Sequence, residues 1–386
     1  MTTQAAHMGE TSVGSQVLYM ALELSATKWK VLFANSAGKR RERCVDARDL
    51  ARLLEEIVEA KRRLGLAAGA HVLSCYEAGR DGFWIDRALR ASGIENLIVD
   101  SSSIEVARRA RHRKTDRLDL VKLMGLLVRF AGGEKRVWSV VRVPDAADED
   151  IRQLSRAIGR LKGERGQHRS RIKSLLALVG LQLASIGGRT WAKRVGELRG
   201  WDGTALGHHL QRDLISEGER LGLVESQLTA LKAERAELVE KSAAPAAVTA
   251  RRLAELGAIA AESSFVFATE LFGWRRFDNR RQLAGSVGLV PTPYQSGNSD
   301  REQGVSKAGN GRMRTMLVEI AWLWLRHQPA SALSLWWQGR FGKTGGRARK
   351  SAIVALARKL LVALWRYLEQ GIVPEGATLK TRRVPA

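Results

Sequence analysis

The sequence predicts an α/β fold in its first third and an α fold in the remainder. Three patterns support this prediction. Short apolar runs alternate with amphipathic segments up to residue 147, heptad repeats begin at Asp148, and helical periodicity dominates from residue 249. Strands come first and then alternate with helices, an order that implies a mixed sheet covered by helices. We expect five segments: a disordered leader at 1–16, three folded parts at 17–147, 148–248 and 249–372, and a tail at 373–386.

The predicted sheet begins with Val17–Leu22, a short and almost continuous apolar run typical of a strand buried on both faces. Trp29–Phe33 alternates as a second strand, and the basic segment Arg40–Val45 completes a meander. We then expect a helix with Asp46 as its N-cap. It carries a leucine and isoleucine stripe and ends at Gly65.

Two further apolar runs, Val72–Tyr76 and Leu97–Val99, predict strands on either side of a helix around Phe83–Leu89. Another helix is expected from Asp116 to Phe130. From Asp148 the apolar residues recur at alternating steps of three and four, which predicts two long helices packed as a coiled coil. We expect these heptad seams to mediate subunit pairing. The first helix is strongly basic, the second carries many Glu residues, and Ala243–Ala247 is expected to form a linker.

The last part is predicted to be helical with two long loops. The segment Gln282–Val290 is mostly apolar and Pro291–Gly311 is a polar loop region. A Trp-rich helix is expected over Arg312–His327 and a Gly- and Arg-rich loop over Gly339–Lys350. An amphipathic helix, Ser351–Glu369, completes this part.

The composition indicates a globular protein with a polyanionic partner. The chain has 386 residues and 45% hydrophobic content, and its 64 Lys and Arg against 40 Asp and Glu give a net charge of +24. Such a charge points to nucleic acid, with an acidic membrane surface as the other common interpretation. No apolar run approaches the roughly 18 residues of a membrane span. Two cysteines and no signal-peptide pattern predict a reduced, cytoplasmic protein without a disulfide scaffold or a cysteine-based zinc site.

Four carboxylates have positions that could serve catalysis. Glu23 and Glu77 each follow a predicted strand, and Asp116 and Asp119 begin a helix three residues apart on one face. Strand ends and a helix start can converge at one edge of a mixed sheet. Four acids gathered there would repel each other unless cations lie between them. Mg²⁺, or alternatively Mn²⁺, suits such a site and phosphoryl transfer.

A basic segment precedes Asp116, and a basic rim beside an acidic pocket is what a metal-dependent nuclease needs. Its members are Arg108, Arg109, Arg111, Arg113 and Lys114. Each acid also has an ordinary structural alternative. Glu23 and Glu77 can be turn residues, Asp116 can cap its helix, and Asp119 can pair with a neighbouring cation.

Several segments resemble one known family when they are taken together and in order. In the first part they are Tyr19-Met20-Ala21-Leu22-Glu23-Leu24-Ser25, Tyr76-Glu77-Ala78-Gly79 and Lys114-Thr115-Asp116-Arg117-Leu118-Asp119. In the last part they are Leu283–Pro291, Thr292-Pro293-Tyr294-Gln295-Ser296-Gly297, and Ser306–Asn310 with Arg314. The chain resembles the RuvC-like DEDD transposases of the IS110 family of insertion sequences over about residues 17–370.

The resemblance implies an RNase H-like, RuvC-like catalytic domain over 17–147 and a serine-bearing transposase domain over 249–372. It implies that Glu23, Glu77, Asp116 and Asp119 bind Mg²⁺ and that Ser296 attacks DNA to form a covalent phosphoserine. The family usually has Asp where this chain has Glu23. Relatives often have a Pro-Gly-Ile-Gly hairpin where this chain has Leu256–Ala260.

The resemblance also implies the partners. They are DNA at the element ends and target, a structured bridge RNA as guide, and further copies of the chain in a homodimer or homotetramer. The residues expected to contact nucleic acid are Arg111, Arg113, Lys114, Arg160, Arg169, Lys307, Arg312, Arg314 and Arg347. Such contacts to phosphates are salt-sensitive and largely independent of sequence.

Two other functions are compatible with the residues alone. The first is a nuclease of the Holliday-junction type that uses water as nucleophile and needs the acids but not Ser296. The second is a catalytically inactive nucleic-acid-binding relative. Ser296 can also be a plain turn serine before Gly297, and on composition Ser299 and Ser306 are rival nucleophiles.

Overall fold

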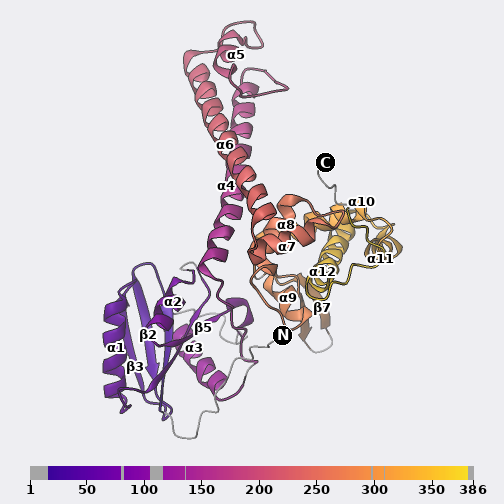
Figure 1. Ribbon diagram of the computed structural model, residues 1–386. Coiled ribbons are helices and arrows are strands. Elements are labelled where there is room, and N and C mark those ends of the chain that lie inside the picture. Colours follow the sequence, from indigo (N-terminus) through magenta and orange to yellow (C-terminus); the bar gives the residue numbers. More distant parts are fainter. Residues whose placement is uncertain are drawn as a thin grey trace. The chain divides into compact units, whose positions relative to one another are not determined.

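The computed structural model describes residues 16–79, 82–104, 116–134, 136–296, 299–307 and 309–380. The chain divides into two compact units, Met1–Val143 and Pro144–Ala386 (Figure 1). The first contains the sheet, and the second contains the long helices and the C-terminal helices.

Unit 1 is built on a mixed five-stranded sheet, as the sequence predicts. Its strands are β1 (Val17–Leu24), β2 (Lys28–Ala34), β3 (Arg40–Asp46), β4 (His71–Glu77) and β5 (Glu95–Val99), in the spatial order β3-β2-β1-β4-β5. The β1–β2 and β2–β3 pairs are antiparallel, whereas β4 lies parallel to β1 and β5 parallel to β4. The central strand is buried on both faces, because Leu18, Met20, Ala21 and Leu22 are at most 1% exposed.

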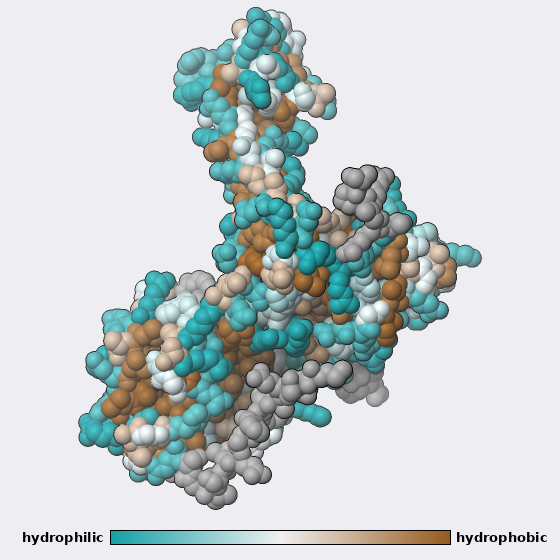
Figure 2. Space-filling model, in the orientation of Figure 1, coloured by the Kyte–Doolittle hydropathy of each residue, from teal (hydrophilic) through white to brown (hydrophobic). Residues whose placement is uncertain are grey.

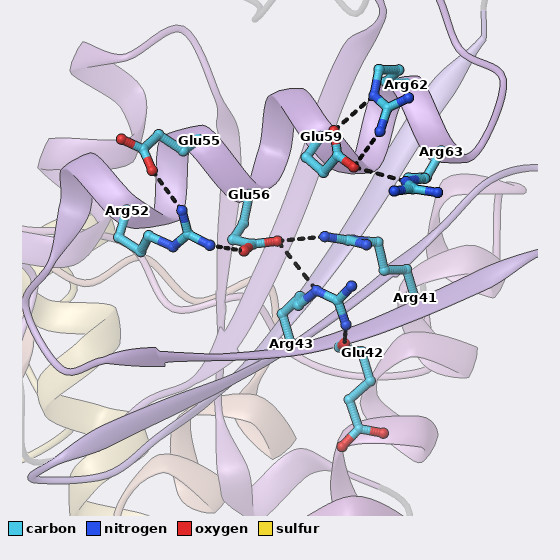
Figure 3. Close-up of polar contacts among 9 residues, drawn as sticks. All are labelled: Arg41, Glu42, Arg43, Arg52, Glu55, Glu56, Glu59, Arg62 and Arg63. Atoms are coloured by element: carbon cyan, nitrogen blue, oxygen red, sulfur yellow. Dashed lines mark hydrogen bonds and ion pairs between the residues drawn. The ribbon is translucent and has the colours of Figure 1, made fainter.

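The helices of unit 1 are α1 (Leu50–Arg63), α2 (Trp84–Ala91) and α3 (Asp116–Ala131), with a short 3₁₀ turn η1 (Ser101–Ser103). The predicted N-cap of α1 is wrong. Asp46 ends β3 opposite Lys28, and it is Asp49 that accepts a hydrogen bond from the Arg52 amide. A buried carboxylate, Glu56, holds α1 to β3 through arginines of both elements (Figure 3).

α3 covers one face of the sheet. Its Leu120, Leu123 and Leu127 share a buried core with Ala21 of β1 and Cys75 of β4. Because side chains alternate along a strand, residues two positions from Ala21 and Cys75 point to this same face.

Unit 2 begins with two long helices, α4 (Ala146–Ala177) and α6 (His208–Lys241), joined by a segment that contains α5 (Trp191–Glu197). Their heptad seams pack on each other, so Ile172 and Leu176 share a core with Leu214 and Leu221. The seams therefore pair within one chain, and the expectation that they mediate subunit pairing is not needed to explain them. Hydrophilic residues cover much of the visible surface of this helical pair (Figure 2).

The rest of unit 2 is mainly helical with one β-hairpin. Its elements are α7 (Pro245–Ala254), α8 (Ala261–Phe267), the π-helix η3 (Ala268–Phe272), α9 (Arg280–Ser286), β6 (Pro291–Ser296), β7 (Ser299–Val305), α10 (Gly311–His327), α11 (Ala332–Phe341) and α12 (Gly346–Gln370). α10 and α12 form the centre of the core with Leu317, Trp324, Leu360 and Leu364.

Three expectations for this region need correction. The polar segment 291–311 is not a loop throughout, because its residues 291–296 and 299–305 pair as the β6–β7 hairpin. The predicted linker starts α7, because Pro245 occupies its first turn, where a missing N–H is harmless. The loop predicted at 339–350 is short, since α11 continues to Phe341 and α12 begins at Gly346.

The segment expected to be a tail is part of the fold as far as Lys380. Thr378 exchanges hydrogen bonds with Gln328 of the α10 C-terminus, and the Lys380 ammonium donates to the carbonyls of Ala254 and Ile259. In the described ranges, no helix is long and apolar enough to cross a membrane.

Candidate active site

Glu23 and Glu77 occupy matching positions on neighbouring parallel strands. The register of β1 with β4 runs from Val17–His71 to Leu22–Tyr76, so the next two residues, Glu23 and Glu77, stand side by side. Glu23 lies inside β1 opposite Lys30, and Glu77 is the last residue of β4, opposite Val99 of β5. Both are half-buried, at the edge of the sheet where the parallel strands end.

Both glutamates belong to the face that α3 covers. Glu23 is two residues beyond Ala21, and Glu77 is two residues beyond Cys75, which are both in the α3-facing core. Burial raises the pKa of the Cys75 thiol well above its usual value, and the negative charge of Glu77 raises it further.

The two aspartates lie at the start of α3. Asp116 is its first residue, and Asp119 is half-buried directly before Leu120 of the core. α3 packs against β1 and β4, so the structure brings the start of the α3 sequence and the two glutamates to one face of one unit. The side chain of Asp116 lies outside the described part of the chain.

Carboxylate oxygens are the ligands that Mg²⁺ prefers, and Glu23 and Glu77 can supply two of them from one edge. Among the described side chains, no group of three or more His, Cys, Asp or Glu is arranged to hold a metal ion. Asp100, directly after β5, is a third acid at the end of a parallel strand. Asp100 was not among the predicted residues, although an acid after the run Leu97–Val99 is a visible signal.

Ser296 lies in unit 2 as the last residue of β6 and is paired with Ser299 of β7. The hairpin starts at Pro291, which is paired with Val305, and its register shifts between Pro291 and Pro293. Several residues of the predicted motifs and of the basic segment lie outside the described residues: Arg108, Arg109, Arg111, Arg113, Lys114, Thr115, Gly297 and Ala308.

The base of the hairpin is clamped to the loop after α9. The amides of Ser306 and Asn310 donate to the carbonyls of Val290 and Ser286, at 2.9 Å each. The Arg314 guanidinium donates to the carbonyls of Val287 and Lys307. Gly309 has a φ of 85°, and a Cβ there would lie 2.4 Å from the Ser286 oxygen, so the clamp requires glycine.

A buried carboxylate, Glu270, links this clamp to the long helix α4. Its Oε1 accepts hydrogen bonds from Arg156 of α4 at 2.9 Å and from Arg312 of α10 at 3.2 Å. Its Oε2 accepts hydrogen bonds from Arg156 at 3.2 Å and from the side-chain Nδ2 of Asn310, the N-cap of α10, at 3.3 Å. Burial alone would raise the pKa of Glu270, but the charge and hydrogen bonds of Arg156, with the charges of Arg312 and Arg152, lower it.

Glu270 stands in η3, and such π-helical turns are frequently found at functional sites. Glu270 was not predicted from the sequence, because its partner Arg156 is 114 positions away.

The predicted nucleic-acid contacts fall into two groups. Arg312 and Arg314 point into the protein, where Arg312 also donates to the Ser155 carbonyl at 2.8 Å, and Arg169 pairs with Glu225 of α6 at 2.7 Å. Arg160, Lys307 and Arg347 are exposed, and Lys307 has a φ of 56°, in the left-handed region. Contacts within the protein therefore account for the first group, whereas the second group is exposed at the surface.

Comparisons with known proteins decide the family. The chain is 43% identical over 376 residues to "Putative transposase y4rJ" of Sinorhizobium fredii, which covers 94% of this chain and 95% of that protein. The chain belongs to the IS110 family of transposases. Residues 250–336 match the transposase family IS116/IS110/IS902, and this stretch of the transposase contains the β6–β7 hairpin, its clamp and α10.

Two further relatives agree with this assignment. The transposase is 32% identical to the similarly named y4qE of the same organism over 317 residues, 76% of this chain and 75% of that protein. It is 26% identical to the transposase for insertion sequence element IS1111A of Coxiella burnetii over 229 residues, 57% of this chain and 58% of that one.

Proposed function

We propose that this transposase cuts and rejoins DNA through a covalent phosphoserine at Ser296, with Mg²⁺ held by Glu23, Glu77, Asp116 and Asp119. The observation that carries the proposal is the matching position of Glu23 and Glu77 on parallel strands, on the face that α3 covers. The strand order β3-β2-β1-β4-β5, with an antiparallel meander extended by two parallel strands, supports an RNase H-like fold for unit 1.

The acids and the serine belong to different units, so the proposed site needs both of them. Unit 1 supplies the carboxylates and unit 2 supplies the serine hydroxyl, from one chain or from two copies of it. A dimer or tetramer fits this requirement, because exchange between two element ends needs two sets of catalytic groups.

The proposed reaction has two steps. The Ser296 oxygen attacks the phosphorus of a DNA phosphodiester, the bond from phosphorus to the 3′ oxygen breaks, and the 3′ oxygen leaves as a hydroxyl after taking up a proton. In the second step a 3′-hydroxyl of another strand attacks the phosphoserine, and Ser296 is released. One phosphoester bond is made for each one broken, so no ATP is needed.

Residues of the chain would hold the metal ion and position the serine hydroxyl. The carboxylates of Glu23 and Glu77 supply hard oxygen ligands, and a bound Mg²⁺ would stabilise negative charge on the phosphate and lower the pKa of a nearby hydroxyl. The clamp at Ser286–Val290 fixes the base of the hairpin that carries Ser296. Held in this way, the hairpin can present Ser296 at a fixed distance from the core.

We also propose that a structured RNA guides the choice of DNA and that the protein acts in the cytoplasm. The net charge of +24 and the exposed cations Arg160, Lys307 and Arg347 support a polyanionic partner beyond the DNA at the catalytic site.

The test is to incubate the protein with element-end DNA, target DNA, guide RNA and Mg²⁺ and to look for a protein–DNA adduct on a denaturing gel. We expect an adduct for the wild type and none for Ser296→Ala. Ser299→Ala is the matched control, because Ser299 is the cross-strand partner of Ser296, and its adduct should persist.

The other outcomes separate the alternatives. An adduct with Ser296→Ala would mean that another residue is the nucleophile. Cleavage without any adduct, lost in Asp116→Asn but kept in Ser296→Ala, would support a water-using nuclease. Salt-sensitive binding with no cleavage by any variant would support an inactive relative.

A further inference from the structure

A groove runs along one face of α12 in unit 2. Its volume is about 1100 Å³, at the upper end of the roughly 300–1,000 Å³ typical of small-molecule sites. One wall is the base of the β6–β7 hairpin, and the other is formed by the start of α11 and residues 372–375. It is long enough for an extended ligand, because Arg347 and Arg366 of its lining are about 28 Å apart along the helix, at 1.5 Å per residue.

The floor of the groove is apolar and made of small side chains. Val354, Ala355, Val362 and Ala363 of α12 recur at helical spacing on this face and are half-buried or exposed. Short side chains leave room for flat groups to lie against the helix. The Trp336 ring also lines the groove, but the Lys359 ammonium lies 4.5 Å from its centre and covers it.

The rim is strongly basic. Six cations and one carboxylate, Glu375, line the groove; the cations are Arg280, Arg347, Lys350, Arg358, Lys359 and Arg366. Within the part of the chain that the structure describes, none of these cations makes an ion pair, and the Lys359 ammonium lies over the Trp336 ring instead. Six largely uncompensated charges around an apolar floor favour a polyanion that also carries flat apolar groups.

The groove leads to the hairpin that carries the candidate nucleophile. Pro291 and Val305, which pair at the base of the hairpin, line the groove, and Ser296 lies five residues further along β6. A strand held along α12 therefore lies against the base of the hairpin that contains Ser296.

We infer that the α12 groove binds a single DNA strand, with phosphates at the basic rim and bases against the apolar floor. The inference rests on the proposed function, since it assigns the groove to the strand that Ser296 attacks. A single strand satisfies all three observations, because it is extended, polyanionic and carries flat bases. A duplex has its bases stacked inside and would meet the rim but not the floor.

The test measures binding of a short fluorescein-labelled DNA strand to the full-length protein by fluorescence anisotropy at several salt concentrations. We expect Arg358→Gln with Arg366→Gln to weaken binding on the order of tenfold and to reduce the slope of log K against log salt by about 1.4, or 0.7 per phosphate contact. The matched control is Arg62→Gln with Arg63→Gln, the same charge change at arginines that already pair with Glu59, and it should bind as the wild type does.

A second variant tests the floor without changing charge. Ala355→Trp fills the groove at an exposed position of α12 and should weaken binding while leaving the salt slope unchanged. Circular dichroism melting checks that each variant is folded.

The outcomes are separable from those of the proposed function. Wild-type affinity in both groove variants would overturn the inference even if Ser296 forms an adduct. Weakened strand binding would support it even if no adduct forms. An equal loss in the control, a loss confined to an RNA strand or a duplex of the same length, or a change only in oligomeric state by sedimentation would also overturn it.

Discussion

Two clusters of cations in this molecule differ in their surroundings. The arginines of β3 and α1 surround a buried carboxylate, whereas the cations of the α12 groove line an apolar floor. Around Glu56, which has a side chain only 7% exposed, three guanidiniums converge from Arg41, Arg43 and Arg52 (Figure 3). In the groove, Arg347, Arg358 and Arg366 have no carboxylate partner within the described part of the chain. A net charge of +24 therefore does not describe a uniform surface. Some cations pair with buried carboxylates, and others have no carboxylate partner among the described residues.

The largest expected effect is at the paired cluster. Glu56→Ala leaves three guanidiniums close together without their shared carboxylate, and we expect unit 1 to lose about 3 kcal/mol of unfolding free energy. Urea denaturation followed by circular dichroism measures it. The matched control is Glu55→Ala, because Glu55 is exposed and, among the described residues, pairs with Arg52 alone; it should change stability by at most about 0.5 kcal/mol. Equal effects of the two variants would remove the distinction between the regions.

A smaller effect is expected when the long helical pair is titrated with acid. Glu217 of α6 accepts hydrogen bonds from His168, Arg171 and Arg220; burial opposes its ionisation, but these partners lower its pKa to about 2 from 4.5. A carboxyl group whose pKa is depressed by folding stabilises the protein above its unfolded pKa, and this contribution is lost as the pH falls toward the folded value.

Between pH 4.5 and about 2, Glu217→Gln should therefore lose less stability than the wild type. We expect the difference in Tm between the two proteins to narrow by roughly 3 °C over this range. A Tm difference that stays constant would show that the ion pairs across α4 and α6 contribute no pH dependence.

The smallest expected effect on stability is in the groove. Arg358→Gln with Arg366→Gln removes charges that have no described partner, so the unfolding free energy should change by at most about 0.5 kcal/mol. The same urea titration measures it, with Glu56→Ala as the positive reference. A loss above about 2 kcal/mol would mean that these arginines are structural, and the contrast with β3 and α1 would disappear.

The sequence predicted the sheet well because its signals are local. The run Val17–Leu22 is apolar on both faces, and β1 is indeed the buried central strand. The N-cap of α1 was misplaced by three residues, since Asp46 and Asp49 have the same capping chemistry and only the length of β3 decides between them.

The hairpin escaped prediction because Pro291, Pro293 and Gly304 are poor strand formers, and its pairing depends on the clamp beneath it. Apolar heptads do not reveal whether the partner helix belongs to the same chain, so the subunit role given to α4 and α6 had no local test. Glu270 and the groove were invisible for a related reason. Glu270 pairs with a residue 114 positions away, and the groove is lined by cations whose lack of a carboxylate partner depends on the whole fold. Neither feature leaves a pattern in one stretch of sequence.

For the candidate site, the sequence supplied Glu23, Glu77, Asp116, Asp119 and Ser296. The register of β1 and β4 explains why two acids that are 54 positions apart, 77 − 23, become neighbours. The participation of all five residues in one reaction stays a prediction.

The ion pair between Arg156 and Glu270 attaches α4 to the C-terminal part of unit 2. This helix is about 48 Å long at 1.5 Å per residue. Its Arg156 binds the Glu270 carboxylate, which also accepts hydrogen bonds from Arg312 and Asn310. Through this one carboxylate, α4 shares buried polar contacts with the first turn of α10, which adjoins the base of the hairpin that carries Ser296. The long helical pair is therefore anchored at the segment that positions the candidate nucleophile.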